Sequence, residues 1–286
     1  VLCSEAYRTT LKQQLAAGAR SFAAARQAAV QALCPGSDIA ALLDKPNNNL
    51  AVEYCKAIIE QNVEMQPIAL PRQGADHGQA LTESAHAAFA SASALRALWA
   101  EGGAAALAPY VPEKALKLYK KAEYDGKYTD FAVMGHCELA LLRAACAGQA
   151  PFAAVRGVSE GLEHRLENAV RETASLPALL DALTTVRYPR ARMRRLAMDA
   201  ALGYTAQTPA LPPYLHLLGA RKEALPLPGE TALPLSHSLA RLARENETCA
   251  QMAAAQSRAS DLGALCRAKP EPMGGIYRQK IIFLTN

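Results

Sequence analysis

Polar and basic side chains at several places in the chain are suited to binding a phosphorylated ligand. Asn47-Asn48-Asn49 precedes a predicted helix, and one asparagine is enough to cap it. The spare amides of this run, with Asn47 as the candidate, have the donors and acceptors to read a nucleobase or a ribose. Arg72 directly follows the best strand candidate, and its guanidinium matches phosphate oxygens in pairs at any working pH. A helix cap and a solvated loop charge are the ordinary alternatives.

A second candidate phosphate site lies at the start of a later helix. Ser91 begins this predicted helix, and Arg96 lies in its first turns. A helix N-terminus with a small hydroxyl side chain is ready to bind an anion, although Ser91 also fits an ordinary N-cap. Both residues are therefore candidates for binding phosphate.

The densest basic feature is the stretch 187–195, which we call the arginine segment. It contains no acid and five arginines, namely Arg187, Arg190, Arg192, Arg194 and Arg195. Solvated helix faces usually interleave both signs of charge, and Tyr188 offers a stacking surface beside backbone contacts. The segment therefore favours nucleic-acid binding. The alternative is that these arginines pair with acids such as Glu160 on neighbouring helices.

Composition excludes several classes of protein. Of the 286 residues 51% are hydrophobic and 20% charged, which predicts a folded protein with a real core. A net charge of +5 is compatible with a polyanionic partner. Every apolar run of membrane-spanning length contains a charge, so no membrane is expected. The seven cysteines lack a C-x-x-C pair and the six histidines are scattered, which predicts no metal site and a reducing cytoplasm. No catalytic residue can be named.

The elements that must position these residues are predicted to be mainly helices. A helix capped by Ser4, a second from Ser21 and a third from Leu50 to about Gln61 precede the strand Met65–Leu70. This order predicts a short parallel-sheet remnant packed by three helices.

Beyond residue 90 the signals are helical and are bounded by Gly and Pro. We expect helices at about 91–101, 112–122, 131–146, 162–172, 176–186 and 191–202, with a short one from Pro212 to Gly219 and a looser chain after Pro226. A boundary at Gly102-Gly103 divides the chain into residues 1–102 and 103–286.

Several motifs, in order along the chain, resemble those of the bacterial tRNA(Met) cytidine acetate ligase family. Glu160 to Leu166 is similar to its E-G-L-E-x-R-I. The other matching stretches are 45–54 (P-N-N-x-L-x-x-E-Y), Arg72 with Asp76-His77 (the post-strand Arg and D-[YH]-H loop), 90–96 (A-S-A-[TS]-x-I-R), 110–112 (F/Y-[LV]-P), 187–195 (K-R-Y-T-x-x-R-x-x-R) and 214–219 (Y-[IL]-R-[LV]-L-G).

The resemblance implies a mainly α chain, with the remnant of a nucleotidyltransferase-like (Rossmann-like) α/β domain in 1–102 and a helical tRNA-binding domain in 103–286. It implies that acetate is activated with ATP, accompanied by Mg²⁺, and that the acetyl group passes to the wobble cytidine of elongator tRNA(Met), without DNA. Asn47 and Arg72 would contact ATP, Ser91 and Arg96 would lie near the phosphates, and the arginine segment would bind tRNA.

One departure from the family is clear. The family opens with an H-x-G-H-type loop that binds the triphosphate, and no His here is followed by x-Gly-His. We interpret the chain as an N-terminal truncation and expect it not to form acetyl-adenylate at an appreciable rate. The competing hypotheses are a non-catalytic helical RNA-binding module and an adenylyltransferase for a small metabolite.

Overall fold

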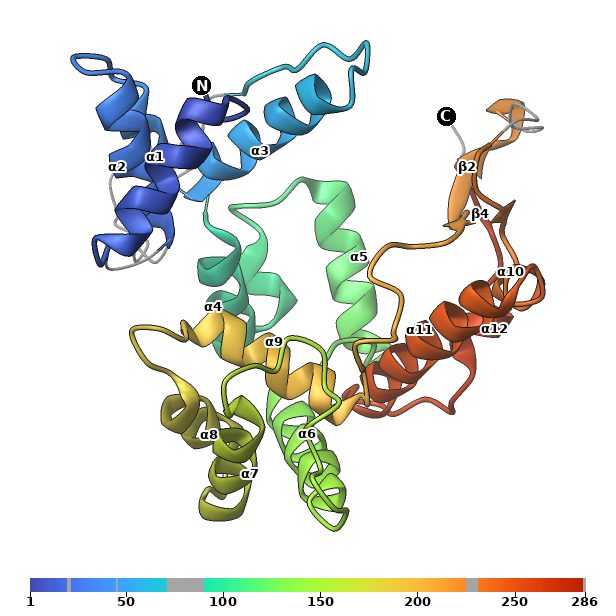
Figure 1. Cartoon of the computed structure of the whole chain (residues 1–286). Coiled ribbons are helices and arrows are strands. Elements are labelled where there is room, and N and C mark those ends of the chain that lie inside the picture. The colour runs from blue at the N-terminus through green and yellow to red at the C-terminus, as the bar shows by residue number, and fades with distance from the viewer. Residues whose placement is uncertain (20–21, 45, 71–89, 225–230, 285–286) are drawn as a thin grey trace. The chain divides into compact units, whose positions relative to one another are not determined.

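The computed structural model describes residues 1–19, 22–44, 46–70, 90–224 and 231–284. By packing, the chain divides into two compact units, residues 1–75 and 76–286 (Figure 1). This division places the helix that follows Ser91 in the second unit, whereas the sequence boundary at Gly102-Gly103 assigned it to the first domain. The functional boundary at 102/103 stays a prediction.

The first unit is a small helical assembly. It contains α1 (Glu5–Ala16), α2 (Phe22–Leu33), the 3-10 turn η1 (Ala40–Asp44) and α3 (Pro46–Glu60). The predicted cap of α1 is confirmed, because the Ser4 side chain accepts a hydrogen bond from the Tyr7 backbone N–H at 3.2 Å. Its core is formed by Tyr7, Ala29, Val30, Ala40 and Leu43.

The third helix begins earlier than the sequence suggests. It starts at Pro46, so the three asparagines lie inside its first turn and do not form a turn before Leu50. Proline favours this first helical position because its φ is already helical and its missing N–H needs no partner there. The Asn49 side chain donates to the carbonyl of Leu43 at 2.7 Å, which fixes the approach from η1.

The predicted strand Met65–Leu70 is wrong. These residues form no regular element, and Ile68 and Leu70 are 82% and 87% exposed. A strand is stable only when its backbone groups pair with a neighbour, and no neighbouring strand pairs with this segment among the described residues. Apolar composition gives a segment β propensity, but it does not provide the ladder partner.

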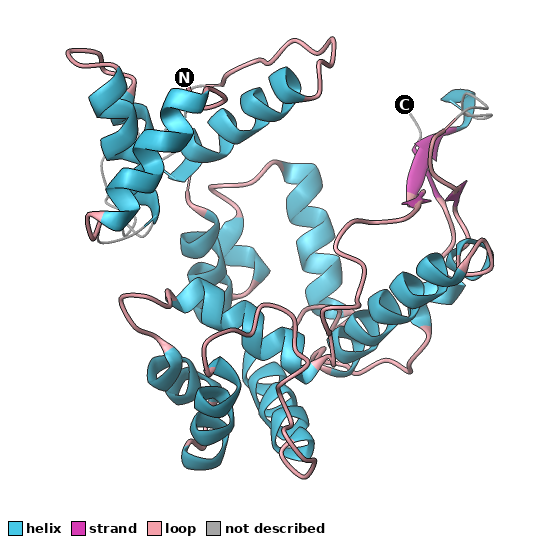
Figure 2. Ribbon diagram, viewed as in Figure 1, coloured by secondary structure: helices cyan, strands magenta, loops and turns pink. Residues whose placement is uncertain are grey.

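The second unit is predominantly helical, as the ribbon shows (Figure 2). Its elements are α4 (Ala92–Gly102), η2 (Ala104–Leu107), α5 (Glu113–Tyr124), α6 (Phe131–Ala145), α7 (Leu162–Glu172), α8 (Leu176–Leu183), α9 (Arg190–Ala201), β1 (Leu215–His216), β2 (Gly219–Arg221), η3 (Lys222–Ala224), β3 (Leu235–Ser236), α10 (Leu239–Leu242), α11 (Glu247–Leu265), α12 (Gly275–Arg278) and β4 (Ile282–Leu284). The six helices predicted between residues 91 and 202 are confirmed to within a few residues.

The main core of this unit lies between α6, α7, α8 and α9. Its most buried members include Leu142, Leu166, Leu179 and Met193, each fully shielded from solvent. On α7 the buried residues Leu162, Leu166, Ala169 and Val170 recur at helical spacing, so one face of this helix enters the core. Burial of this face is what holds an otherwise charged helix in place.

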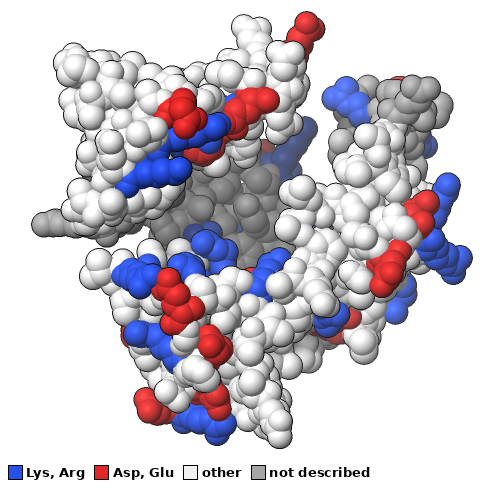
Figure 3. Space-filling view, in the orientation of Figure 1, with Lys and Arg blue, Asp and Glu red and all other residues white. Residues whose placement is uncertain are grey.

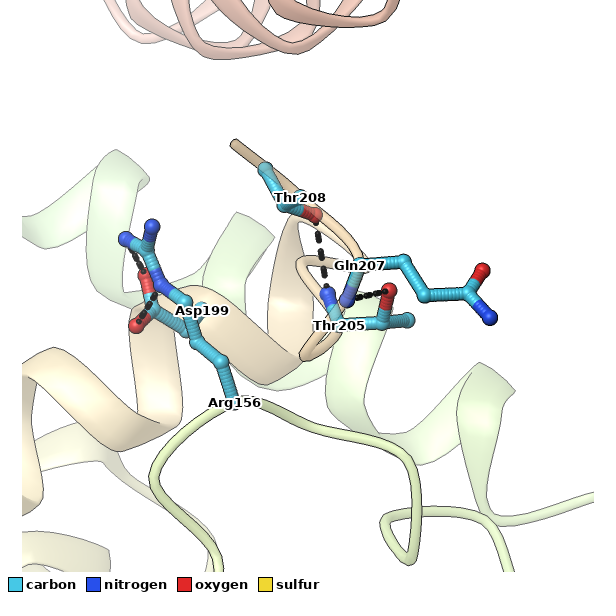
Figure 4. Close-up of polar contacts among 5 residues, drawn as sticks. All are labelled: Arg156, Asp199, Thr205, Gln207 and Thr208. Carbon is cyan, nitrogen blue, oxygen red and sulfur yellow. Dashed lines mark hydrogen bonds and ion pairs between the residues drawn. The ribbon is translucent and has the colours of Figure 1, made fainter. Parts of the chain in front are cut away.

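A bidentate ion pair joins the loop before α7 to α9 (Figure 4). Both Arg156–Asp199 contacts, Nε to Oδ2 and Nη2 to Oδ1, measure 2.7 Å. The Arg156 guanidinium also lies over the Tyr204 ring at 4.9 Å, and the Tyr204 hydroxyl donates to the carbonyl of Ala255 on α11. This group therefore connects the loop, the end of α9 and α11.

The junction of α4 and α5 is held by polar and aromatic contacts. A Glu123 carboxylate oxygen accepts a hydrogen bond from the Ala104 backbone N–H at 3.0 Å, next to Gly103, whose positive φ favours glycine. The Trp99 ring meets the Tyr119 and Tyr128 rings at centroid distances of 5.5 and 5.8 Å. These contacts fix α4 against α5.

The C-terminal third differs from the expectation in two respects. The helix predicted from Pro212 to Gly219 is wrong: the backbone is extended there, and β1 pairs in parallel with β3 while β2 pairs with β4. The chain after Pro226 is also more regular than expected, because it contains the 19-residue helix α11. Asn246 caps α11 by accepting a hydrogen bond from the Cys249 N–H at 2.9 Å.

The buried face of α7 gives a direct test of the core. Replacing Leu166, which is fully buried, with Ala should lower the free energy of unfolding by about 2–5 kcal/mol, because it leaves a cavity. The matched control is Leu118→Ala on α5, where the side chain is 70% exposed and the change should stay within about 0.5 kcal/mol. Urea denaturation of the two variants measures both values, and equal losses would contradict this description of the core.

Candidate functional site

Helix α9 presents its arginines outward because its other face is buried. Met193, Leu196, Ala197 and Ala200 enter the core and recur every three to four residues. The charged side chains of the arginine segment therefore have only the surface left to occupy.

The five arginines of the segment do not share one environment. Arg187 forms an ion pair with Glu160, and Arg190 forms one with Asp181. The Arg192 guanidinium lies over the Tyr188 ring at 5.1 Å. For Arg187 and Arg190, the alternative that the arginines pair with acids of neighbouring segments is therefore what the structure shows.

The remaining two arginines differ from the others. Within the part of the chain that the structure describes, Arg194 and Arg195 are exposed and form no ion pair. Unpaired exposed guanidinium groups keep their donors available for a phosphate. These two side chains are therefore the best candidates in the segment for contacting tRNA, while the role of all five stays a prediction.

Both unpaired arginines line a cavity of about 1050 Å³ in the second unit. Residues from four helices form it: Arg96 from α4, Phe131 and Glu138 from α6, Leu176 from α8, and Arg190, Arg194 and Arg195 from α9. Arg96 is thus brought together with the arginine segment, although 91 residues or more separate them in sequence. Figure 3 shows basic side chains gathered over α9, with acidic side chains beside them.

Glu138 is the residue of this cavity that the sequence analysis missed. Its side chain is 1% exposed, and its Oε1 atom has no hydrogen-bond partner among the described residues. Burial raises the pKa of its carboxyl to about 7, and the positive charge of Arg194 acts in the opposite direction. A lone acid among the apolar residues of the segment 131–145 was the available signal.

Ser91 has a structural role in this unit. It is buried, caps α4 by accepting a hydrogen bond from the Ala94 N–H at 3.2 Å, and lies 2.9 Å from the Ser93 hydroxyl. The N-cap alternative is therefore observed for Ser91. Its contact with phosphate stays a prediction.

The two candidate ATP contacts, Asn47 and Arg72, are not among the described residues that line this cavity. Asn47 is exposed in the first turn of α3 in the first unit, where the helix dipole favours anions. Arg72, like Asp76 and His77, lies outside the described residues. The contact of both residues with ATP stays a prediction.

Neither a metal-binding cluster nor a membrane-spanning helix is found among the described residues. In the described ranges, no three His, Cys, Asp or Glu side chains are grouped to hold a metal ion. No described helix has the length and apolarity needed to span a bilayer.

Comparison with known proteins identifies relatives along most of the chain. Residues 2–273 match the family described as HIGH Nucleotidyl Transferase. A tRNA(Met) cytidine acetate ligase of Listeria monocytogenes serotype 4b is 30% identical over 183 residues, covering 63% of this chain and 45% of that protein. One of Caldanaerobacter subterraneus is 28% identical over 200 residues, covering 68% and 47%. The chain spans about half the length of these relatives.

Solved structures show the same fold. The apo form I crystal structure of Thermotoga maritima TmcAL superposes with a TM-score of 0.83 over 99% of this chain and 71% of that one, at 21% identity. The form II structure, bound with alpha-thio ATP, has a TM-score of 0.82 at 20% identity. The resemblance found in the sequence is therefore confirmed, and so is a helix-rich, nucleotidyltransferase-like fold.

The buried carboxyl of Glu138 makes stability depend on pH. Because its native pKa of about 7 exceeds its ordinary value of 4.5, the folded protein holds more protons than the unfolded chain between these values. The free energy of unfolding therefore falls as pH rises through this window. In the parent, this fall in the free energy of unfolding amounts to up to about 3 kcal/mol, and Glu138→Gln should remove it. The variant should therefore have a higher Tm than the parent at pH 8 but not at pH 4.5.

Thermal melts at both pH values check this expectation. Other ionisable groups around the cavity, Arg96, Arg190, Arg195 and His136, are unchanged in the variant and cancel in the comparison. Glu101→Gln on α4, an exposed position, is the control and should shift Tm equally little at both pH values. A Tm difference for Glu138→Gln that is independent of pH would contradict the assignment.

Proposed function

The chain belongs to the HIGH nucleotidyl transferase family, and from this premise we propose that it acts in an ATP-dependent ligase for tRNA. The ligase activates acetate as acetyl-adenylate and acetylates the wobble cytidine of elongator tRNA(Met), in the cytoplasm. Relatives named tRNA(Met) cytidine acetate ligase support this assignment. The single observation that carries the tRNA part is the set of unpaired arginines, Arg194 and Arg195, exposed beside Arg96.

The proposed reaction has two steps. An acetate oxygen attacks the α-phosphorus of ATP, the α–β phosphoanhydride bond breaks, and pyrophosphate leaves. The exocyclic amine of cytidine then attacks the acetyl carbonyl carbon and loses a proton. The bond from that carbon to the phosphate oxygen breaks, and AMP leaves. Charge develops on phosphate oxygens in the first step, and fixed guanidinium and helix N-terminal groups stabilise such charge without titrating.

Residues of the first unit would serve the nucleotide. Asn47, at the positive end of the α3 dipole, and Arg72, which follows in sequence, are proposed to hold ATP. Mg²⁺ is proposed to accompany ATP and to be held mainly through the phosphates, as is usual for this ion. Support for ATP itself comes from the TmcAL structure bound with alpha-thio ATP, which shares this fold.

The second unit would serve the tRNA. Arg194, Arg195 and Arg96 are proposed to contact backbone phosphates, which position a nucleic acid without reading its sequence. Arg187 and Arg190 are expected to contribute less, since binding would first have to break their pairs with Glu160 and Asp181.

The alternative is a non-catalytic RNA-binding module. The same arginines favour it, because they would bind tRNA whether or not the first unit binds a nucleotide. ATP binding therefore separates it from the ligase, and tRNA binding separates the ligase from an adenylyltransferase for a small metabolite.

The tRNA surface can be tested through the salt dependence of binding. Arg194→Gln combined with Arg195→Gln should lower the slope of log K against log [KCl] by about one to two units, because each lost phosphate contact removes roughly one. Fluorescence anisotropy of labelled elongator tRNA(Met) measures this slope. The control is Arg187→Gln combined with Arg190→Gln, which removes the same charge from ion-paired positions and should change the slope less. A lower Tm with an unchanged slope in the first double variant would refute the assignment.

The ATP contacts require a separate measurement. Asn47→Ala and Arg72→Ala should each weaken alpha-thio ATP binding roughly tenfold, since each removes a hydrogen bond to a charged ligand. Isothermal titration calorimetry gives the affinities. Asn48→Ala, a change of the same size one residue along α3, is the control and should bind as the parent does. Parental affinity in both test variants would remove these residues from the ATP site.

A further inference from the structure

The cavity between α4, α6, α8 and α9 has apolar walls and a buried acid, neither of which is needed for contacts with phosphates alone. We infer that it receives one nucleotide of a bound RNA: the phosphate lies on the arginines, and an amino group on the base donates to the carboxyl of Glu138. This inference deepens the proposed function and rests on it for the presence of an RNA.

The walls of the cavity suit a base. Apolar side chains dominate them, including Phe131, Met134, Leu176, Leu180 and Met198. Phe131 is 67% exposed, so its ring is available for stacking at the cavity, which is a common way of holding a base that has left its stack. A volume of about 1050 Å³ exceeds what a single nucleotide fills and leaves space for its flanking backbone.

The charges of the cavity suit a phosphate. Its described lining residues include four arginines (Arg96, Arg190, Arg194 and Arg195) and His136, and Glu138 is the one acid among them. Arg96 and Arg194 reach it from different helices, so a phosphate between them would be held from two sides. An acidic peptide would also satisfy the arginines, but it would place a second carboxylate near Glu138, which is unfavourable.

The buried carboxyl of Glu138 points to a bound ligand independently of the arginines. Its side chain is buried, it lines the cavity, and Oε1 lacks a hydrogen-bond partner among the described residues. An unpaired buried carboxyl is costly, and a ligand that donates a hydrogen bond removes that cost. Base amino groups are such donors, and carboxylates accept hydrogen bonds from the amino group of cytosine. Uracil carries a carbonyl oxygen at the same position, and a carbonyl oxygen cannot donate this hydrogen bond.

The test compares two short RNAs that differ mainly in whether each base carries the amino group of cytosine or the carbonyl oxygen of uracil. Labelled heptamers of cytidine and of uridine are titrated with the whole chain at pH 8, and binding is followed by anisotropy. We expect the cytidine heptamer to bind roughly tenfold more tightly, and Glu138→Gln to bring the two within about twofold, because an amide accepts from cytosine and donates to uracil equally well. Glu101→Gln should keep the parental ratio.

A matched pair of arginines tests the phosphate contact. Arg194→Gln and Arg192→Gln remove the same charge two residues apart on α9, but only Arg194 lines the cavity. Arg194→Gln should weaken the cytidine heptamer roughly tenfold, and Arg192→Gln less than threefold. Melting curves establish that all variants are folded.

Several results would overturn the inference. These are equal affinity of the parent for the two heptamers, an unchanged ratio in Glu138→Gln, and equal losses in the two arginine variants. Binding of free CMP as tight as that of the cytidine heptamer would assign the cavity to a free nucleotide, and equal binding of hepta-aspartate would assign it to acidic peptides. If elongator tRNA(Met) binds with a steep salt slope while the heptamers do not differ, only this inference fails. If tRNA does not bind, the proposed function fails.

Discussion

The arrangement of the second unit depends on which face of α9 is buried. Met193, Leu196, Ala197 and Ala200 fill the space between α6, α7 and α8, and a helix can bury only one such stripe. Arg192 is thereby directed to Tyr188, and Arg194 and Arg195 to the cavity. A single packing constraint thus divides a uniformly basic sequence into two surfaces with different neighbours.

The Arg156–Asp199 pair stabilises that orientation at the other end of the helix. Its two parallel hydrogen bonds, with Tyr204 packed against the guanidinium, limit rotation of α9 about its own axis. Asp199 is the acid on α9 that lies nearest to the arginine segment, which it follows by one turn or more. Its carboxylate is already paired with Arg156 of the loop. The arginines of the cavity therefore keep their charge uncompensated from within their own helix.

Local rules predicted much of this fold and little of the cavity. Caps such as Ser4 and Ser91, and the Gly and Pro residues between segments, gave the helices up to α9 within a few residues, because these signals act over one turn. The family was evident from motifs in order. Met65–Leu70 and the segment after Pro212 were assigned wrongly, because strands depend on a distant partner. Glu138 was missed for the same reason: its burial is produced by α8 and α9, which follow it by 38 residues or more.

The contacts of Trp99 have a spectroscopic consequence. It is the one tryptophan of the 286 residues, it lies three positions after Arg96 on α4, and its ring packs on Tyr119 and Tyr128. Light absorbed by these tyrosines is transferred to an indole at such short range, so the emission of the unlabelled protein comes mainly from one place. Its wavelength and its quenching by iodide report how tightly α4 packs on α5. The chain thus carries a built-in fluorophore on a helix that borders the cavity.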